Sequence, residues 1–123
     1  MDLLTVVKLT TFIGTGYFLQ CAATSAKYCT DQNVVPNDNT KYMARGLAGG
    51  VLAMTMFCYK AAWGGSDADL QTVALVCFWT FTFWFVNAVH RIFMPKTKPS
   101  LGSKIDVGIC TMFMSLYGFH LFF

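Results

Sequence analysis

Hydrophobic residues form four long runs along the chain, and charged residues are confined to the ends of these runs and to the segments between them. The first run is an uncharged stretch of 18 residues between Lys8 and Lys27. At about 1.5 Å per helical residue it covers roughly 27 Å, close to the hydrocarbon thickness of a bilayer. The runs predict four transmembrane helices, over residues of about 6–26, 42–63, 70–93 and 107–123.

The third run is the clearest of the four, because residues 70–89 carry no charge and are rich in Val, Phe and Trp. The second run has Arg45 and Lys60 near its ends, where long basic side chains reach the headgroups. The first run is the most polar, so one of its faces is expected to pack on protein. Its polar residues are Thr10, Thr11, Thr15, Gln20, Thr24 and Ser25.

The segments between the runs are short and rich in turn-forming residues, at 31–40, 64–67 and 95–103. Short links place consecutive helices antiparallel. In the second link, the side chain of Ser66 or Asp67 is expected to cap the third helix. The sequence therefore predicts an all-α integral membrane protein with four antiparallel transmembrane helices in a single domain, residues 1–123.

The composition agrees with a membrane protein and disfavours a water-soluble domain. Hydrophobic residues make up 55% of the chain and charged residues 12%, where a soluble domain carries roughly a quarter charged residues. The net charge of +3 comes from basic residues in the links, so no basic stripe for nucleic acid is present. Five cysteines with no CxxC pair are interpreted as small buried hydrophobes, with one bridge through Cys29 left open.

The basic residues are distributed unequally between the two sides of the predicted bundle. Seven lie on the side of the first and third links, either in these links or at the adjoining helix ends, and only Lys8 and Lys60 lie on the side of the termini. The positive-inside tendency therefore places loops 27–44 and 94–106 toward cytosol, stroma or matrix, and both termini in the opposite compartment. An alternative makes the first run a cleaved signal peptide with a site at 24–26, although Asp2 weakens its basic end.

Four side chains are candidate single axial ligands for a pigment such as chlorophyll: His90, His120, Asn87 and Gln20. A haem bound by both histidines is not expected, because they lie near opposite ends of the bundle, about 20 Å apart in depth at helical rise. The alternative for each histidine is an interfacial side chain bonded to headgroups or to a neighbouring carbonyl.

Asn87, His90 and Arg91 form the most notable polar group, because Asn87 shares a helix face with both of the others. Asp106 is expected at similar depth, so that an ion pair with Arg91 locks the third and fourth helices together. A proton relay is the alternative. A relay or a transporter would use a carboxylate at mid-membrane, and every Asp lies at a run end or in a link, while the sequence contains no Glu.

Small residues indicate where helices approach closely. Gly46 and Gly50 form a GxxxG pair at the start of the second run, and Ala22 and Ala26 lie at matching depth on the first. We expect internal packing of these two helices at that point. Dimerisation through the glycine face is the alternative.

These features favour a non-catalytic, small polytopic accessory or scaffold subunit of a larger membrane complex. The high aromatic content, 16%, suits contacts with other membrane-complex subunits and lipids. The expected setting is an energy-transducing complex, a photosystem or respiratory complex, in a thylakoid or mitochondrial inner membrane. The alternatives are a subunit that binds chlorophyll or lipid, and a small membrane enzyme or carrier that uses Asn87, His90, Arg91 and Asp106.

Overall fold

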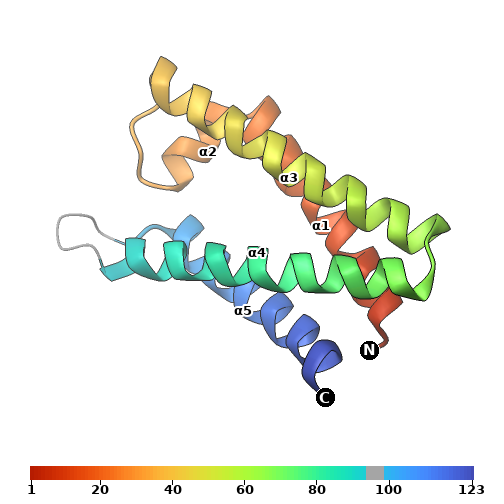
Figure 1. The fold of residues 1–123 in the computed structure, drawn as a ribbon. Coiled ribbons are helices and arrows are strands. Elements are labelled where there is room, and N and C mark those ends of the chain that lie inside the picture. The colour runs from red at the N-terminus through yellow and green to blue at the C-terminus, as the bar shows by residue number, and fades with distance from the viewer. Residues whose placement is uncertain (94–98) are drawn as a thin grey trace.

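A computed structural model describes residues 1–93 and 99–123, and within them the chain is all-α with no strand. The described part contains five helices (Figure 1), namely α1 (Leu3–Ala23), α2 (Ser25–Asp31), α3 (Asp38–Gly64), α4 (Asp67–Phe93) and α5 (Leu101–Phe122). Each of the four hydrophobic runs thus corresponds to one long helix, and the first run continues beyond α1 into the short helix α2.

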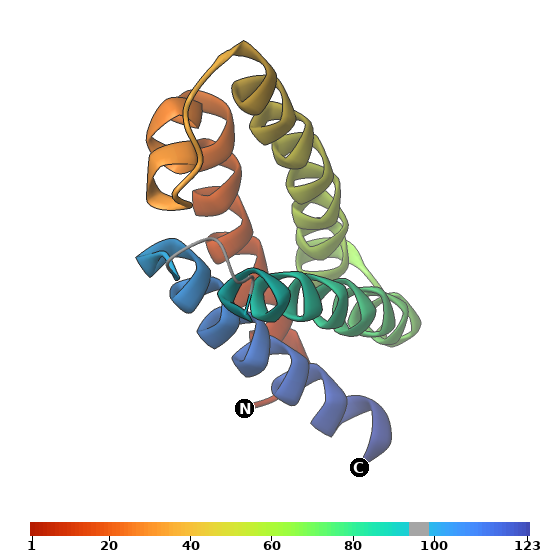
Figure 2. The same ribbon diagram turned by 90° about the vertical axis from the view of Figure 1, so that its left-hand side faces the viewer.

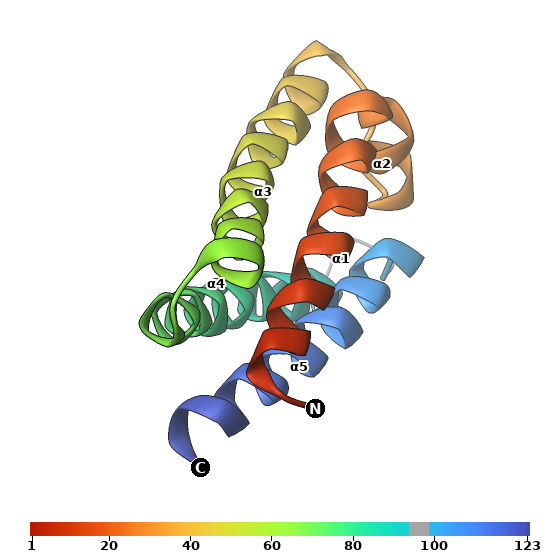
Figure 3. The ribbon, with the colours of Figure 1, turned by 90° about the vertical axis from the view of Figure 1, so that its right-hand side faces the viewer.

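The long helices are arranged as two pairs. α1 packs mainly on α3, and α4 packs mainly on α5. Figures 2 and 3 show α1 and α3 side by side, with α4 and α5 crossing beneath them. Both termini and the turn between α3 and α4 lie at one end of the molecule, whereas α2, the end of α4 and the start of α5 lie at the other (Figure 1). The long helices therefore alternate in direction, as the short links predict.

Local hydrogen bonds fix where the helices begin. The Asp2 carboxylate accepts from the Thr5 amide, and the Asn37 side chain accepts from the Thr40 amide. The Ser66 hydroxyl accepts from the Asp69 amide, so of the two expected caps for α4 it is Ser66 that acts. The Asp69 carboxylate returns the bond by accepting from the Ser66 amide at 2.7 Å. Only Gly65 and Ser66 separate α3 from α4.

The boundaries of two predicted spans differ from the structure. The first, 6–26, is interrupted at Thr24, whose φ of −120° and ψ of 45° end α1 before α2 begins. The fourth, 107–123, lies within α5, which starts at Leu101 because the Ser100 hydroxyl accepts from the Ser103 amide. Residues 94–98 of the predicted third link lie outside the described residues.

All four long helices contribute side chains to one hydrophobic core. Phe81 of α4 stacks on Phe113 of α5, with ring centroids 4.7 Å apart. Val6 and Val7 of α1 are fully buried in the same cluster. The core lies toward the end of the molecule that carries the termini, and it leaves the opposite end to a group of polar contacts.

Two helices, α4 and α5, are long and apolar enough to cross a membrane. Their most apolar stretches are only 22% and 17% buried within the chain. The other two long helices are not among these candidates: α1 carries Lys8 and four threonines, and α3 carries Lys41, Arg45 and Lys60. Membrane association is therefore indicated by two helices, and the crossing of α1 and α3 stays a prediction.

Candidate functional site

A cavity of about 290 Å³ lies between the α1–α3 pair and the α4–α5 pair. Its walls are apolar over most of their length, where Ile13, Val51, Met54 and Phe81 line it. Toward α2 the lining becomes polar. The polar side chains there are Tyr28, Gln32, Asn87, Arg91, Ser103 and Asp106.

Gln32 connects three elements at the polar end of this cavity. Its side-chain amide donates from Nε2 to Oδ2 of Asp106 at 3.0 Å, and its Oε1 accepts from the Ser103 hydroxyl at 3.2 Å. Its backbone carbonyl accepts from the Arg91 guanidinium at 2.6 Å. Gln32 is only 5% exposed, so these bonds replace the water that this amide would otherwise bind.

The close approach of α5 to this segment depends on Gly102. A Cβ atom at Gly102 would lie 2.7 Å from both the Asp31 carbonyl oxygen and the Gln32 amide nitrogen. Any larger residue would therefore push the start of α5 away from Gln32 and separate the polar contacts. The sequence positions the site through a small residue as well as through hydrogen-bonding ones.

The expected ion pair between Arg91 and Asp106 does not form. The ion pair found within the described residues joins Lys27 to Asp31 on the surface of α2. Arg91 and Asp106 both bind Gln32 instead. The ion pair was expected because Arg91 and Asp106 lie at similar depth on α4 and α5. In the structure, the segment that follows α2 lies between the two charged side chains.

Asp106 has an unmet hydrogen-bonding capacity. Its Oδ2 accepts from Gln32, but its buried Oδ1 has no hydrogen-bond partner within the described residues. A buried carboxylate oxygen without a donor is costly. A guanidinium carries five N–H donors, and Arg91 is seen to use one nitrogen, in its bond to Gln32. The polar end thus holds one unused acceptor and several unused donors.

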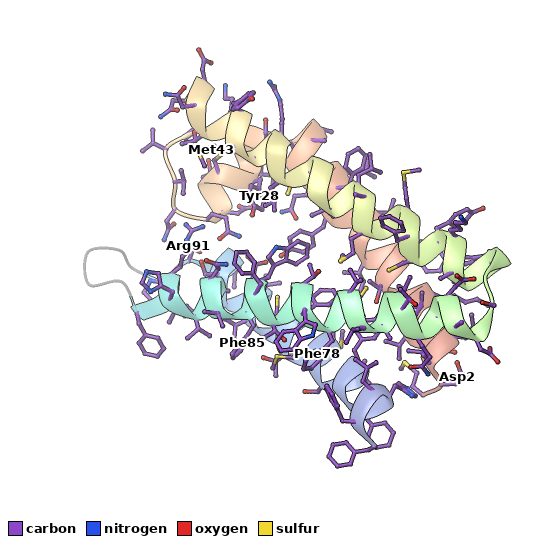
Figure 4. The ribbon with its side chains drawn as sticks, in the orientation of Figure 1. Asp2, Tyr28, Met43, Phe78, Phe85 and Arg91 are labelled. Carbon is purple, nitrogen blue, oxygen red and sulfur yellow. The ribbon has the colours of Figure 1, made fainter. Side chains whose placement is uncertain are left out.

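Tyr28 adds a neutral hydroxyl to the same region. Figure 4 shows Tyr28 on α2 and Arg91 on α4, both in the region between the two helix pairs. Desolvation by burial raises the pKa of Tyr28 to about 12, and the nearby Arg91 charge opposes this rise. The phenol therefore stays protonated at neutral pH and offers the cavity a hydrogen-bond donor.

The four candidate pigment ligands are not brought together. Asn87 lines the cavity, and its amide nitrogen donates to the Phe83 carbonyl at 3.0 Å. His90 is exposed on α4 and has no hydrogen bond within the described residues. His120 shares a 2.8 Å hydrogen bond with the Met1 carbonyl, and Gln20 lies outside the cavity lining. Pigment ligation by any of them stays a prediction.

The expected packing of Gly46 and Gly50 against α1 is wrong. A Cβ atom at either glycine would meet nothing within 4 Å, and both residues are exposed. The close approach of α1 and α3 occurs instead at Gly14, where a Cβ would collide with the Thr55 hydroxyl. The GxxxG spacing marks a small-residue face correctly, but it does not say which way that face points.

Three polar residues of the site, Tyr28, Gln32 and Ser103, were not predicted. Gln32 lies in the polar link, where an amide side chain ordinarily faces water. A weak signal for Ser103 is its spacing from Ser100, since serines three residues apart are typical of a helix start. No comparable signal exists for Gln32, because its role depends on contacts with α4 and α5.

The cysteines form no metal centre in the part of the chain that the structure describes. All five are free and buried, and no cluster of three or more His, Cys, Asp or Glu is found there. Cys58 and Cys77 lie with their sulfur atoms 3.5 Å apart in the core.

No known protein family matches this sequence, and no curated protein or solved structure matches it.

Proposed function

We propose that this protein is an integral membrane protein whose four long helices all cross the bilayer, and that it serves as a non-catalytic accessory subunit of a larger membrane complex. The observation that carries the proposal is a belt of large apolar side chains on the outside of every long helix. Its members, each at least 47% exposed, include Phe12, Leu19, Met56, Phe57, Leu75, Val76, Trp79, Phe83, Val86, Phe119 and Phe122. Water would be a poor solvent for such a surface.

The hydroxyl groups on the same faces support a hydrocarbon environment. Thr80 and Thr111 face outward, and their hydroxyls donate to the carbonyls of Val76 and Val107 at 2.8 and 2.7 Å. In a bilayer a donor without water needs an internal acceptor. Thr15 of α1 follows the same rule by donating to the Thr11 carbonyl at 2.8 Å, so the same pattern is found on a helix other than α4 and α5.

Charged and aromatic residues at the helix ends fit a four-span topology. Lys27, Lys41, Arg45, Arg91 and Lys104 belong to the end that carries α2, while Lys96 and Lys98 lie outside the described residues. At the opposite end Lys8 lies over the Trp63 ring, 5.6 Å from its centroid. Aromatic residues with a nearby cation are typical of the headgroup layer. We therefore place loops 27–44 and 94–106 toward cytosol, stroma or matrix.

The accessory role is inferred from what the exposed surface offers to neighbours. The links between the helices are short, so nearly all of the accessible surface belongs to the helices themselves. Trp79 and Phe83 of α4 are exposed by 61% and 67% on its outer face. Large rigid aromatic side chains provide contact area at low entropic cost. We propose that part of this surface contacts other subunits and the remainder contacts lipid.

Purification of the protein from native membrane tests both parts of the proposal. A tag after Phe123, which is 99% exposed, leaves the helix contacts undisturbed. In a mild detergent the tagged protein should elute with other membrane proteins, well above its own size. Recovery solely as a free monomer would contradict the accessory role. A chain that stays monodisperse in buffer without detergent would contradict the membrane placement itself.

A second candidate function, binding of an amphiphile, is favoured by the cavity. An apolar pocket with a few convergent polar groups is the usual form of a small-molecule site.

A further inference from the structure

The cavity has the polarity profile of a lipid seen along the bilayer normal. Its polar groups, Gln32, Arg91 and Asp106, lie at the helix ends beside α2, and its apolar wall, with Met54 and Phe81, lies toward the middle of α3 and α4. In the proposed topology the helix ends are at headgroup level and the apolar wall is within the hydrocarbon. An amphiphile that enters in its ordinary bilayer orientation would therefore match the lining along its whole length.

The polar end carries one positive and one negative side chain that form no ion pair with each other. Arg91 and Asp106 are the charged residues of the lining, and each binds Gln32 instead of the other. A purely anionic head would suit Arg91 but would face the Asp106 carboxylate, and a purely cationic head would have the reverse problem. A head with one charge of each sign satisfies both residues.

Hydrogen-bonding capacity narrows the chemistry of the head further. Oδ1 of Asp106 is a buried acceptor without a donor within the described residues. A rotation of the carboxylate toward the cavity would expose it, and a cationic group with N–H bonds would then supply the donor. The unused N–H groups of Arg91 suit the oxygens of a phosphate, which guanidinium binds with good geometry. A phosphate joined to a primary ammonium has both properties, whereas a quaternary ammonium has no N–H to donate.

The size and opening of the cavity suit one hydrocarbon chain. A volume of about 290 Å³ is at the lower limit of small-molecule sites, which range over about 300–1,000 Å³. Phe83 and Asn87 belong to the lining and are also exposed, so the cavity reaches the outer surface of α4. A chain that begins at the polar end is able to continue past Phe83 into the bilayer.

We propose that this cavity binds a zwitterionic phospholipid with a primary ammonium head, its phosphate at Arg91, its ammonium at the Asp106 carboxylate and one acyl chain along the apolar wall. The proposal rests on the membrane placement of the preceding section but not on the accessory role. It assigns a reason for the unpaired charges and for the unmet Asp106 oxygen, which protein groups alone do not supply.

Native mass spectrometry of the full chain released from detergent tests the proposal with three single-chain probes. These are oleoyl lysophosphatidylethanolamine, oleoyl lysophosphatidylcholine and oleoyl lysophosphatidic acid, which share the chain and the phosphate. We expect the ethanolamine lipid to be retained about tenfold more tightly than the choline lipid, the ratio that one charged hydrogen bond supplies. This comparison needs no variant and therefore does not depend on folding of a mutant.

Two substitutions then assign the groups. Asp106→Asn removes the charge that attracts both ammonium groups and keeps only a neutral acceptor, so it should lower retention of the ethanolamine lipid and, to a smaller extent, of the choline lipid. Arg91→Gln should weaken all three probes. His90→Gln serves as the matched control, because His90 lies one residue from Arg91 but outside the lining, and it should change none of them.

Equal retention of the ethanolamine and choline lipids would overturn the proposal, and so would tightest binding of lysophosphatidic acid. Retention of no probe by a chain that remains folded in detergent would also overturn it, while the membrane placement would stand. A chain that stays monodisperse in buffer without detergent would contradict both the membrane placement and the lipid site. Failure of the lipid site alone is therefore distinguishable from failure of the membrane placement.

Discussion

The hydroxyl oxygens of Thr10 and Tyr117 lie 2.6 Å apart, although 107 residues separate them in sequence. The Thr10 hydroxyl already donates to the Val6 carbonyl at 2.9 Å, so Tyr117 is the donor in this contact. Both side chains are buried. The bond joins α1 to α5, the first and last helices, and ties the two helix pairs together inside the core.

Tyr117→Phe removes this bond and leaves the packing of the ring intact. Because the Thr10 hydroxyl keeps its bond to Val6, the loss should be that of one hydrogen bond, about 1 kcal/mol of unfolding free energy. Chemical unfolding in detergent, followed by helical circular dichroism, measures it. Tyr59→Phe is the control, since Tyr59 is 59% exposed and has no such partner. Equal stability of the two variants would argue against the Thr10 contact.

Gly14→Ala should destabilise the α1–α3 pair, because the new Cβ collides with the Thr55 hydroxyl and lies 3.4 Å from its Cβ. Overpacking of this kind costs about 1–3 kcal/mol. Gly16→Ala, two residues along the same helix, meets nothing within 4 Å, so it should be neutral or stabilise α1 slightly through helix propensity. Thermal unfolding of both variants in one detergent gives the comparison. A tolerated Gly14→Ala would mean that α1 and α3 pack differently.

Gln32→Leu should destabilise the polar end of the cavity. The substitution removes the donor to Asp106 and the acceptor for Ser103, and a buried group left without a partner costs about 1–3 kcal/mol. Gln20→Leu, on the half-exposed part of α1, is the control and should change little. Unfolding free energies of the two variants decide the matter. A Gln32→Leu protein as stable as the wild type would show that these bonds contribute nothing net.

The Asp2 carboxylate should give α1 a pH-dependent stability. The hydrogen bond from the Thr5 amide holds the pKa of Asp2 below its usual range. A lowered folded-state pKa contributes stability that is present above the unfolded value of about 3.9 and is lost as the pH falls through the folded value. Asp2→Asn also caps a helix but does not titrate in this range. Unfolding curves between pH 5 and 2 should therefore converge for the two proteins as the pH falls, and a constant difference would contradict the assignment.

The helices could be predicted from sequence because their determinants are local. Hydrophobic runs bounded by Ser and Asp residues define α4 without any tertiary information, and the Ser66 cap follows from the same pattern. The break at Thr24 has no such signal. α2 turns toward the start of α5, where Gly102 allows close contact with Gln32, and that contact joins segments far apart in sequence.

Three of the six polar side chains of the candidate site could be predicted from sequence, because their polarity near span ends is itself a local signal. Asn87, Arg91 and Asp106 are recognisable because polar residues near span ends need partners. Their actual partners were not predictable, since helical rise gives depth but not which element lies between two helices. The predicted packing of Gly46 and Gly50 against α1 was wrong for the same reason. Spacing places Gly46 and Gly50 on one side of α3, but the rotation of α3 is set by Gly14 and Thr55.

The two-residue turn between α3 and α4 constrains how the chain is made. Such a turn bridges at most roughly 11 Å, so in the proposed four-span topology the two helices enter the bilayer together as a hairpin. Yet α3 packs on α1, which is synthesised before it, whereas α4 packs on α5, which is synthesised after it. Translation stopped before α5 would leave Phe81 without its stacking partner Phe113. The core around Phe81 therefore closes only after α5 has been made.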